Sequence, residues 1–162
     1  EAHYLIADLE KDYDVTVITQ NVDDLHERAG SSKVIHLHGE LTKIRKKGDE
    51  YQNANWVDIG YEPLDLEKYP GYRPAIVFFG EDVPLINKAY NRVADAESLI
   101  VVGTSLQVYP AAGILDFLDP IAPAMIIDPH STLESSASWE VIKDKASKGM
   151  KQVKSFLIKE LK

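Results

Sequence analysis

Apolar positions along the chain follow two spacings, one typical of helices and one typical of strands. Near the start, Ala2, Leu5 and Leu9 recur at helical spacing, which predicts an amphipathic helix. Elsewhere the apolar residues form short continuous runs rich in β-branched side chains, and such runs predict strands. The runs cover residues 15–19, 33–37, 75–79, 98–102 and 124–127, and a shorter one covers 139–142.

Helical spacing returns between and after these runs. Residues 23–29 predict a short helix, and Gly30 suits the left-handed position that ends it. Further helices are expected through Ile86 and Val93, after Pro110, and over 146–161. Strands that alternate with helices indicate βαβ units, so the predicted fold class is α/β, with a mainly parallel sheet and flanking helices.

The segment from Thr42 to Tyr72 has a different character. It is charged and irregular and carries several glycines and prolines, so it is predicted to leave the sheet. Loops of this length are usually either functional or disordered. We therefore expect one domain formed by residues 1–42 and 74–162, with a small insertion at 43–73.

Composition and charge limit the classes of partner. The 162 residues are 44% hydrophobic and 27% charged, which fits one globular domain, and no apolar run approaches the roughly 20 residues of a membrane span. The net charge of −8 disfavours nonspecific attraction to nucleic acid or anionic lipid, so neither nucleic acid nor a membrane is expected as a direct partner. Without cysteine there is no disulfide, no thiolate nucleophile and no cysteine-based zinc site. A cytoplasmic location fits this composition and the lack of a signal-peptide pattern.

Polar side chains gather where the first two predicted strands end. Gln20, Asn21 and Asp23 follow the first strand, and His38 and Gly39 follow the second. In an open α/β sheet, ligands bind beyond the carboxyl ends of the strands. These residues are therefore expected to face a ligand crevice.

The histidines of this stretch allow several interpretations. His36 and His38 occupy alternate strand positions, so they could bind a metal with His26 and Asp23 as further ligands, although a strand with a polar face has the same spacing. His38 alone could act as a general base near pH 7, since Gly39 lets the backbone approach a ligand. From spacing alone, a packed or solvated histidine is the simpler alternative.

Two further strand ends carry less specific patterns. Gly103, Thr104 and Ser105 lie between a predicted strand and a helix, where N–H groups and hydroxyls can hold a phosphate, although the same residues also form ordinary turns. The chain contains neither G-x-G-x-x-G nor a Walker A sequence. Phe79 and Gly80 could pair with an extended peptide or form a plain strand-to-helix turn.

Four motifs occur together and in order: T-Q-N-V-D at 19–23, H-G-E-L at 38–41, I-V-F-F-G-E at 76–81 and G-T-S-L-Q-V-Y-P at 103–110. In this combination the chain resembles the sirtuins (Sir2 family), which are NAD-dependent protein lysine deacylases, and most resembles their bacterial CobB-type branch. The resemblance covers nearly the whole chain. It implies a Rossmann-like NAD-binding domain and a deacetylase or desuccinylase that acts on acyl-lysine proteins or peptides, transfers the acyl group to ADP-ribose and releases nicotinamide.

The resemblance also implies roles for individual residues. His38 matches the catalytic histidine, a neutral base for a ribose hydroxyl. Gln20 matches a contact to the nicotinamide ribose, and Asn21 and Asp23 match the lining of the nicotinamide pocket. The residues that match the acyl-lysine tunnel and its opposite strand are Val77, Phe79, Gly80, Glu81, Gln107 and Val108. Those that match the phosphate and adenosine-ribose site are Gly103, Thr104, Ser105 and Asp128.

Three departures from the sirtuin pattern change what is expected. Cysteine-free residues 42–73 stand where the family carries a four-cysteine zinc module, so no zinc is expected. Asp128 stands in place of the usual asparagine, and its carboxylate would accept from ribose hydroxyls but repel phosphate. The chain opens with Glu1 inside a predicted helix, and the family's G-A-G-x-S segment and cofactor loop would precede it. We therefore expect a piece of a longer protein, with apolar strand surface or an edge left open and no turnover by these residues alone.

Two other functions stay open. An ADP-ribose or peptide-binding module would keep the fold without turnover, although it would not need a base at His38. An H-x-H metallohydrolase would use His36 and His38 as ligands and would hold stoichiometric metal.

Overall fold

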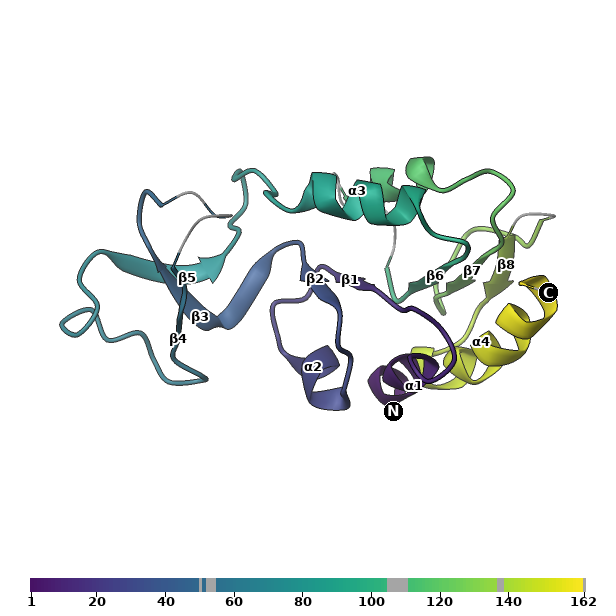
Figure 1. Cartoon of the computed structure of the whole chain (residues 1–162), viewed down its shortest axis with the longest axis horizontal. Helices are drawn as coiled ribbons and strands as arrows, with labels where there is room; N and C mark the ends of the chain where they lie inside the picture. The colour runs from purple at the N-terminus through teal and green to yellow at the C-terminus, as the bar shows by residue number, and fades with distance from the viewer. Residues whose placement is uncertain (50, 52–54, 105–110, 137–138, 162) are drawn as a thin grey trace.

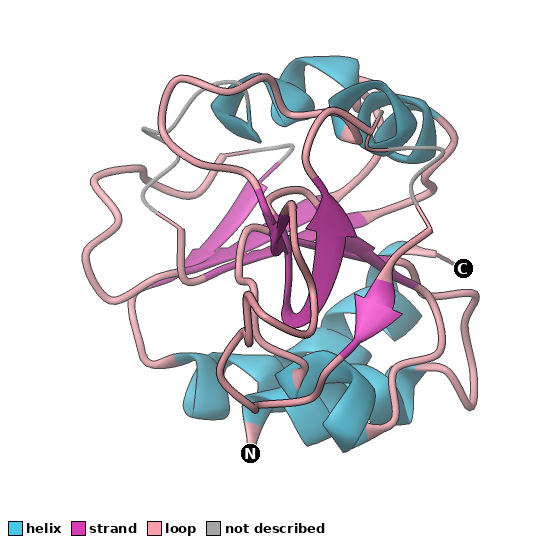
Figure 2. Cartoon of the chain, turned by 90° about the vertical axis from the view of Figure 1, so that its left-hand side faces the viewer, coloured by secondary structure: helices cyan, strands magenta, loops and turns pink. Residues whose placement is uncertain are grey.

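The computed structural model describes residues 1–49, 51, 55–104, 111–136 and 139–161. The molecule is elongated: an antiparallel sheet lies at one end, a pair of parallel strands lies near the middle, and a second parallel sheet lies at the other end (Figure 1). Helices cover the strands on two opposite sides (Figure 2). Within the described residues, none of the helices combines the length and the apolar character that spanning a bilayer requires.

The predicted helices and strands are confirmed in position, apart from the strand at 75–79. The α-helices are α1 (Ala2–Leu9), α2 (Leu25–Ala29), α3 (Ile86–Ala94) and α4 (Ala146–Glu160), and Ala111–Phe117 forms a 3-10 helix, η1. The strands are β1 (Val17–Thr19), β2 (Val34–His36), β3 (Gly39–Lys46), β4 (Val57–Asp58), β5 (Tyr72–Ile76), β6 (Leu99–Val102), β7 (Ala124–Ile127) and β8 (Trp139–Ile142). Gly30 ends α2 in the predicted left-handed conformation, with φ of 106°.

The parallel strands form two separate groups. β1 pairs with β2, and β6, β7 and β8 pair in that order. The α/β fold class with mainly parallel pairing is confirmed, but in the described residues the sheet is interrupted between the two groups. β7 is buried along its whole length because strands flank it on both sides and helices pack against both of its faces.

Two hydrophobic cores lie on opposite faces of the strands. One joins β2 and the start of β7 to α3 and η1, and includes Ile35 and Val93. In the other, Met125 and Ile127, alternate residues of β7, pack against α1 and α4. A Cβ at Gly149 of α4 would lie 2.3 Å from Ile127 Cγ2, so glycine lets this helix approach β7 closely.

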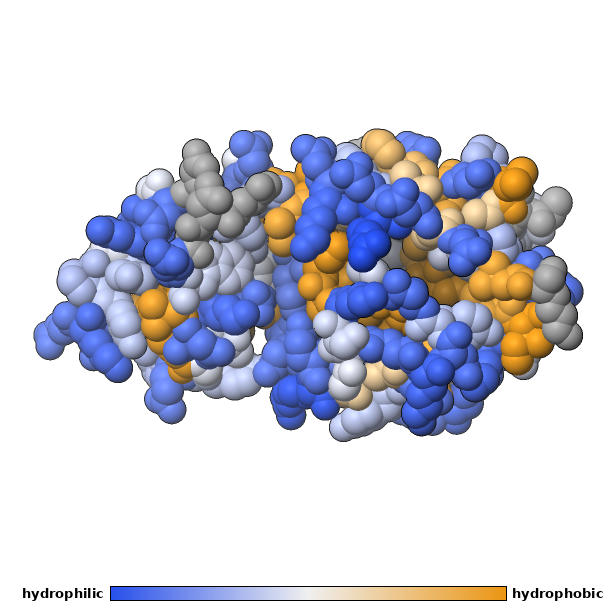
Figure 3. Space-filling model, viewed as in Figure 1, coloured by the Kyte–Doolittle hydropathy of each residue, from blue (hydrophilic) through white to orange (hydrophobic). Residues whose placement is uncertain are grey.

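β6 leaves apolar surface open. It pairs on one side with β7, and Leu99, Ile100 and Val102 are only partly buried, whereas every residue of β7 is buried. Figure 3 shows apolar surface in a hollow around this part of the molecule. The expected open apolar strand edge is therefore present in the described structure.

The third sheet is antiparallel, with strand order β4-β3-β5. It includes the predicted insertion at 43–73 and extends beyond it at both ends. The irregular structure expected for 42–72 is therefore wrong where β3 and β4 run. β3 was not predicted because its sequence is rich in charged residues. Two of these side chains pack against aromatic rings: Lys43 lies 5.9 Å from the ring of Trp56, and Arg45 lies 5.8 Å from the ring of Tyr51.

The buried strand predicted for 75–79 is wrong in its second half. β5 ends at Ile76, which pairs with Gly39 at the beginning of β3, so the ladder stops at this pair. Phe78 is about half exposed and Phe79 is fully exposed in the turn that follows. The apolar run 75–79 therefore spans the end of β5 and the exposed turn that follows it, rather than one buried strand.

Candidate functional site

A loop of residues 20–24 connects β1 to α2 and carries three of the predicted site residues. Asn21 donates its backbone N–H to Thr19 Oγ1 at 3.1 Å, which turns the chain at the end of β1. Asp23 Oδ1 accepts the N–H of Leu25 at 3.1 Å in an Asx turn that starts α2. Short polar side chains within and beside the loop therefore determine its shape.

His36 and His38 hold the same loop. His38 Nδ1 lies 3.0 Å from the carbonyl oxygen of Gln20, and His36 Nδ1 lies 3.2 Å from that of Asn21. The parallel register of β1 and β2 brings the two histidines to this loop. Thr19 pairs with His36, so the residues that follow both strands emerge at one edge of the sheet. The structure thus brings the predicted nicotinamide-side residues and the predicted base together.

The hydrogen bond of His38 fixes its tautomer. A carbonyl oxygen can only accept, so Nδ1 carries the hydrogen and Nε2 carries the lone pair of the neutral ring. The side chain is partly buried rather than enclosed. His38 is therefore oriented to accept a proton at Nε2.

Gly39 brings the backbone of β5 against His38. Its φ of 85° lies in the left-handed region, and a Cβ at this position would lie 2.0 Å from the carbonyl oxygen of Ala75. The N–H of Val77 donates to the carbonyl of His38 at 2.9 Å. Position 39 therefore requires glycine, and the close approach joins His38 to the turn of residues 77–81.

The turn of residues 77–81 is closed by a carboxylate. Arg73 donates to both oxygens of Glu81, at 2.5 and 3.0 Å, and the N–H of Phe78 donates to the same group at 2.9 Å. The hydrogen bonds from Arg73, and next that from Phe78, lower the pKa of Glu81 to about 2. Glu81 thus maintains the turn, while Phe79 faces solvent.

A second group of predicted residues lies at the carboxyl ends of β6 and β7. Gly103 follows β6 with φ of 63° and donates its N–H to the carbonyl of Ile127 at 2.9 Å. Asp128 follows β7, and its Oδ1 accepts the N–H of His130 at 2.6 Å. Adjacent parallel strands bring these two residues to one edge, on a different sheet from the strands that carry His38.

The described structure covers most of the predicted site residues. Thr104, directly after Gly103, is partly buried. Ser105, Gln107 and Val108 lie outside the described ranges, so the structure gives no position for them.

His36 is engaged at both ring nitrogens. Nδ1 faces the carbonyl of Asn21, and Nε2 lies 2.7 Å from Glu27 Oε1. A metal ion would need one of these nitrogens as a ligand, so it would break a hydrogen bond of a buried side chain. This arrangement argues against the metal-site interpretation of His36 and His38.

Glu27 and Tyr61 were not among the predicted site residues. Glu27 lies nine residues before His36, and only the β1-α2-β2 unit brings the two together. Tyr61 donates its hydroxyl to Asp24 Oδ1 at 2.6 Å, which links the turn after β4 to the 20–24 loop. No local sequence pattern predicts either contact, because each joins residues that only the tertiary structure brings together.

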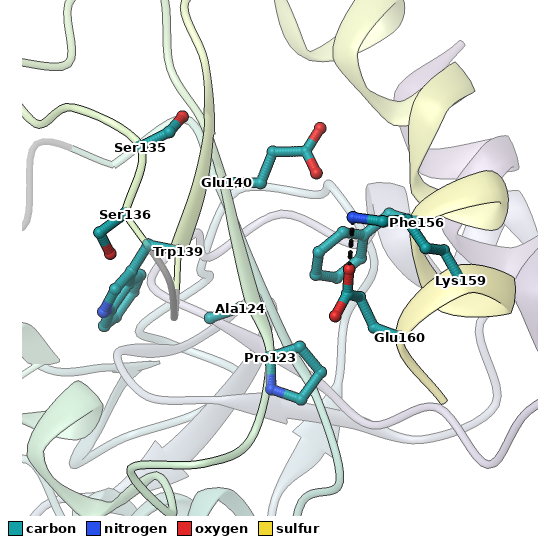
Figure 4. Close-up of a pocket in the computed structure, with 9 residues that line it drawn as sticks. All are labelled: Pro123, Ala124, Ser135, Ser136, Trp139, Glu140, Phe156, Lys159 and Glu160. Atoms are coloured by element: carbon teal, nitrogen blue, oxygen red, sulfur yellow. Dashed lines mark ion pairs between the residues drawn. The ribbon is translucent and has the colours of Figure 1, made fainter. Parts of the chain in front are cut away.

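A pocket of about 220 Å³, shown in Figure 4, is lined by none of the described residues of either group. Ala124 and Trp139, which begin β7 and β8, line it together with Lys159 and Glu160, which form an ion pair of 2.7 Å near the end of α4. This is the amino end of the strands, opposite the edge that Gly103 follows. The pocket is therefore separate from the predicted site.

The sequence matches a known family and named relatives. The model of the Sir2 family matches residues 1–110. An NAD-dependent protein deacylase from Bacteroides thetaiotaomicron is 45% identical over 165 residues, which cover 96% of this chain and 70% of that protein. An NAD-dependent protein deacylase from Helicobacter pylori strain J99 is 48% identical over 132 residues, which cover 81% of this chain and 56% of that protein.

Solved structures resemble the fold as well. A Sir2 homologue in complex with NAD has a TM-score of 0.80 at 34% identity, over 99% of this chain and 65% of that one. A complex of Sir2 with a p53 peptide and NAD+ has a TM-score of 0.75 at 30% identity, over 96% of this chain and 68% of that one. The chain therefore spans between 56% and 70% of the length of these four relatives. The chain belongs to the Sir2 family, which confirms its resemblance to the sirtuins.

Proposed function

We propose that this chain carries the base, the nicotinamide pocket and the peptide-binding turn of an NAD-dependent protein lysine deacylase. Relatives at 45% and 48% identity are named NAD-dependent protein deacylases. The observation that carries the proposal is the orientation of His38 by the Gln20 carbonyl, next to Asn21. Because the chain spans only part of its relatives, the activity is proposed for the whole protein.

His38 is the proposed general base. NAD, when bound, supplies the ribose carbon that receives the acyl oxygen as nicotinamide leaves. Nε2 of His38 accepts the proton of a ribose hydroxyl, because Nδ1 already donates to Gln20. The bond to Gln20 also keeps the ring from rotating, so the lone pair has a fixed direction.

Asn21 and Asp23 are the proposed lining of the nicotinamide pocket, and Gln20 the proposed contact to the nicotinamide ribose. The backbone carbonyls of Gln20 and Asn21 already accept from the two histidines. Nicotinamide would therefore be recognised by side chains of the loop rather than by these two carbonyls. The Asp23 carboxylate accepts one N–H through Oδ1 and has further lone pairs for the N–H groups of a carboxamide.

Gly103, Thr104 and Ser105 are the proposed phosphate and adenosine-ribose site, together with Asp128. A Cβ at Gly103 would meet no atom within 4 Å, so the backbone at this strand end is open to a ligand. The Asp128 carboxylate accepts one backbone N–H and can also accept from ribose hydroxyls. These features fit the adenosine end of NAD.

Acyl-lysine proteins or peptides are proposed to bind at the turn of residues 77–81. Val77 is hydrogen-bonded to the carbonyl of His38, which keeps the turn next to the base. Phe79 is fully exposed, and Gly80 has open space around it. An extended peptide can pair with such a backbone segment. The opposite contact is assigned to Gln107 and Val108.

A cytoplasmic location is part of the proposal. A chain without cysteine gains nothing from an oxidising compartment, and the proposed cofactor is a metabolite of the cell interior.

The decisive experiment measures NAD-dependent removal of acetyl and succinyl groups from a lysine peptide, together with release of nicotinamide. It is done with the 162 residues and with a longer protein that also includes any residues encoded upstream of Glu1. Deacylation that is lost in His38→Ala supports the proposal. Calorimetric binding of NAD or ADP-ribose without deacylation in either protein would instead establish a binding module.

A further inference from the structure

We propose that His36 is a positioning residue that holds the 20–24 loop, and that Glu27 in turn holds the ring of His36. The kinetic consequence of this role rests on the proposed deacylase function. The contacts of His36 do not depend on it.

The contacts of His36 leave its ring no freedom to turn. The side chain is 6% exposed, Nδ1 lies 3.2 Å from the carbonyl oxygen of Asn21, and Nε2 lies 2.7 Å from Glu27 Oε1. A carbonyl oxygen accepts hydrogen bonds and donates none, so Nδ1 carries a hydrogen and donates it to Asn21. A turned ring would lose both contacts inside a buried site.

Glu27 is placed to hold the ring of His36. It lies in the first turn of α2, and its side chain is 40% exposed, so the carboxyl group keeps contact with water while it faces the buried ring. Its contact with Nε2 fixes one edge of the imidazole, and the ring then directs Nδ1 at the carbonyl of Asn21.

His36 acts on the proposed site through one stretch of backbone. It fixes the carbonyl of Asn21, while His38 fixes the carbonyl of Gln20. These are consecutive peptide groups, so release of the Asn21 carbonyl would let the Gln20 carbonyl rotate away from His38 Nδ1. The His36 and Glu27 pair thus supports both the nicotinamide pocket and the orientation of the base.

The positioning contact is tested by nuclear magnetic resonance of the 162-residue chain labelled with 15N at histidine. Long-range couplings between ring nitrogens and ring protons report on the hydrogen bonds of each ring, and His38→Gln identifies the signals of His38. We expect Glu27→Ala to shift the ring signals of His38, because the carbonyls of Asn21 and Gln20 then lose their fixed direction. Glu97→Ala removes one exposed carboxylate elsewhere and is expected to leave the His38 signals unchanged. Unchanged His38 signals in Glu27→Ala overturn the proposal, and this result needs no turnover.

The positioning role is tested by kinetics of the active protein. Glu27→Ala removes the partner of Nε2 and lets the ring of His36 turn, so it is expected to raise the KM for NAD and to weaken inhibition by nicotinamide about 10-fold, the effect of one hydrogen bond to an ionisable group. The melting temperature, compared with that of Glu97→Ala, reports any loss of stability. A role in packing alone would lower the melting temperature and leave both kinetic values unchanged, and that result would exclude positioning. Failure of the deacylase function itself would be seen separately, as absence of turnover in the wild type.

Discussion

Arg73 and Glu81 form a bidentate ion pair, with 2.5 and 3.0 Å between the guanidinium nitrogens and the two carboxylate oxygens. The arginine is the more buried partner, and it also donates to the carbonyl of Ile76 at 3.3 Å. Its guanidinium carbon lies 4.5 Å from the ring centroid of Phe78. One arginine thus fixes both the end of β5 and the turn that presents Phe79.

Replacement of Glu81 by glutamine is expected to weaken peptide binding. The amide cannot accept both N–H groups of Arg73, so the turn of residues 77–81 loses its fixed shape. Because the pair is solvent-exposed, we expect the KM for an acyl-lysine peptide to rise only about two- to fivefold. The affinity for ADP-ribose should not change. Asp82→Asn, which removes the neighbouring exposed charge, is the control, and an equal effect of both variants would contradict the role of the pair.

The pH dependence of the turn follows from the same contact. Arg73 lowers the pKa of Glu81 from 4.5 to about 2, so the ion pair stabilises the folded state above pH 4.5, and this contribution is lost as the pH falls towards 2. Carboxyl 13C chemical shifts during acid titration should give Glu81 a midpoint well below those of other glutamates. In Arg73→Gln the midpoint should return towards 4.5. An unchanged midpoint in that variant would rule out Arg73 as the cause.

The hydrophobic pattern predicts this fold well where burial is one-sided or complete. Buried β7 and the amphipathic helix α4 were both predicted from their apolar spacing. The pattern failed for β3, where Lys43 and Arg45 pack over aromatic rings, and after the end of β5, where Phe79 is apolar but exposed. Hydropathy measures the free energy of transfer of a side chain from water. It predicts neither a cation that packs over an aromatic ring nor an apolar residue that stays exposed.

The candidate site was predictable only in part. His38 and Asn21 stand in a recognisable motif at strand ends, so the sequence identified them. The roles of Glu27 and Tyr61 depend on contacts over 9 and 37 residues of sequence separation, and no short pattern contains such a contact. From the sequence, His36 was interpreted only as a possible metal ligand or as part of a polar strand face, because its two hydrogen bonds are tertiary.

Gly39 offers a direct test of the close approach beside the proposed base. Alanine would combine φ of 85° with a Cβ 2.0 Å from the carbonyl oxygen of Ala75, a backbone atom that cannot move aside easily. We expect Gly39→Ala to lower the free energy of unfolding by about 3 kcal/mol or more. Gly48 is the matched control, because its φ is 86° and nothing lies within 4 Å of a Cβ there. Gly48→Ala should cost only about 1 kcal/mol. Similar urea midpoints for the two variants would show that the approach to Ala75 imposes no constraint.

His26 is expected to make the fold sensitive to acid. It is 8% exposed, its Nδ1 has no hydrogen-bond partner among the described residues, and its ring centroid lies 4.6 Å from that of His3. Burial, and next the charge of His3, lower its pKa, so the unfolded chain binds this proton more readily than the folded one.

Stability should therefore be highest above the ordinary histidine pKa of about 6.5 and should fall as the pH decreases below it. Melting temperatures measured by calorimetry between pH 7.5 and 5.5 test this dependence. His26→Phe keeps a ring against His3 but cannot be protonated, so its melting temperature should fall less over this range. His130, an exposed histidine after β7, provides the control, and His130→Asn should keep the wild-type slope. If His26→Phe keeps that slope as well, the acid sensitivity arises from other groups, because a side chain that cannot titrate contributes nothing to the pH dependence of folding.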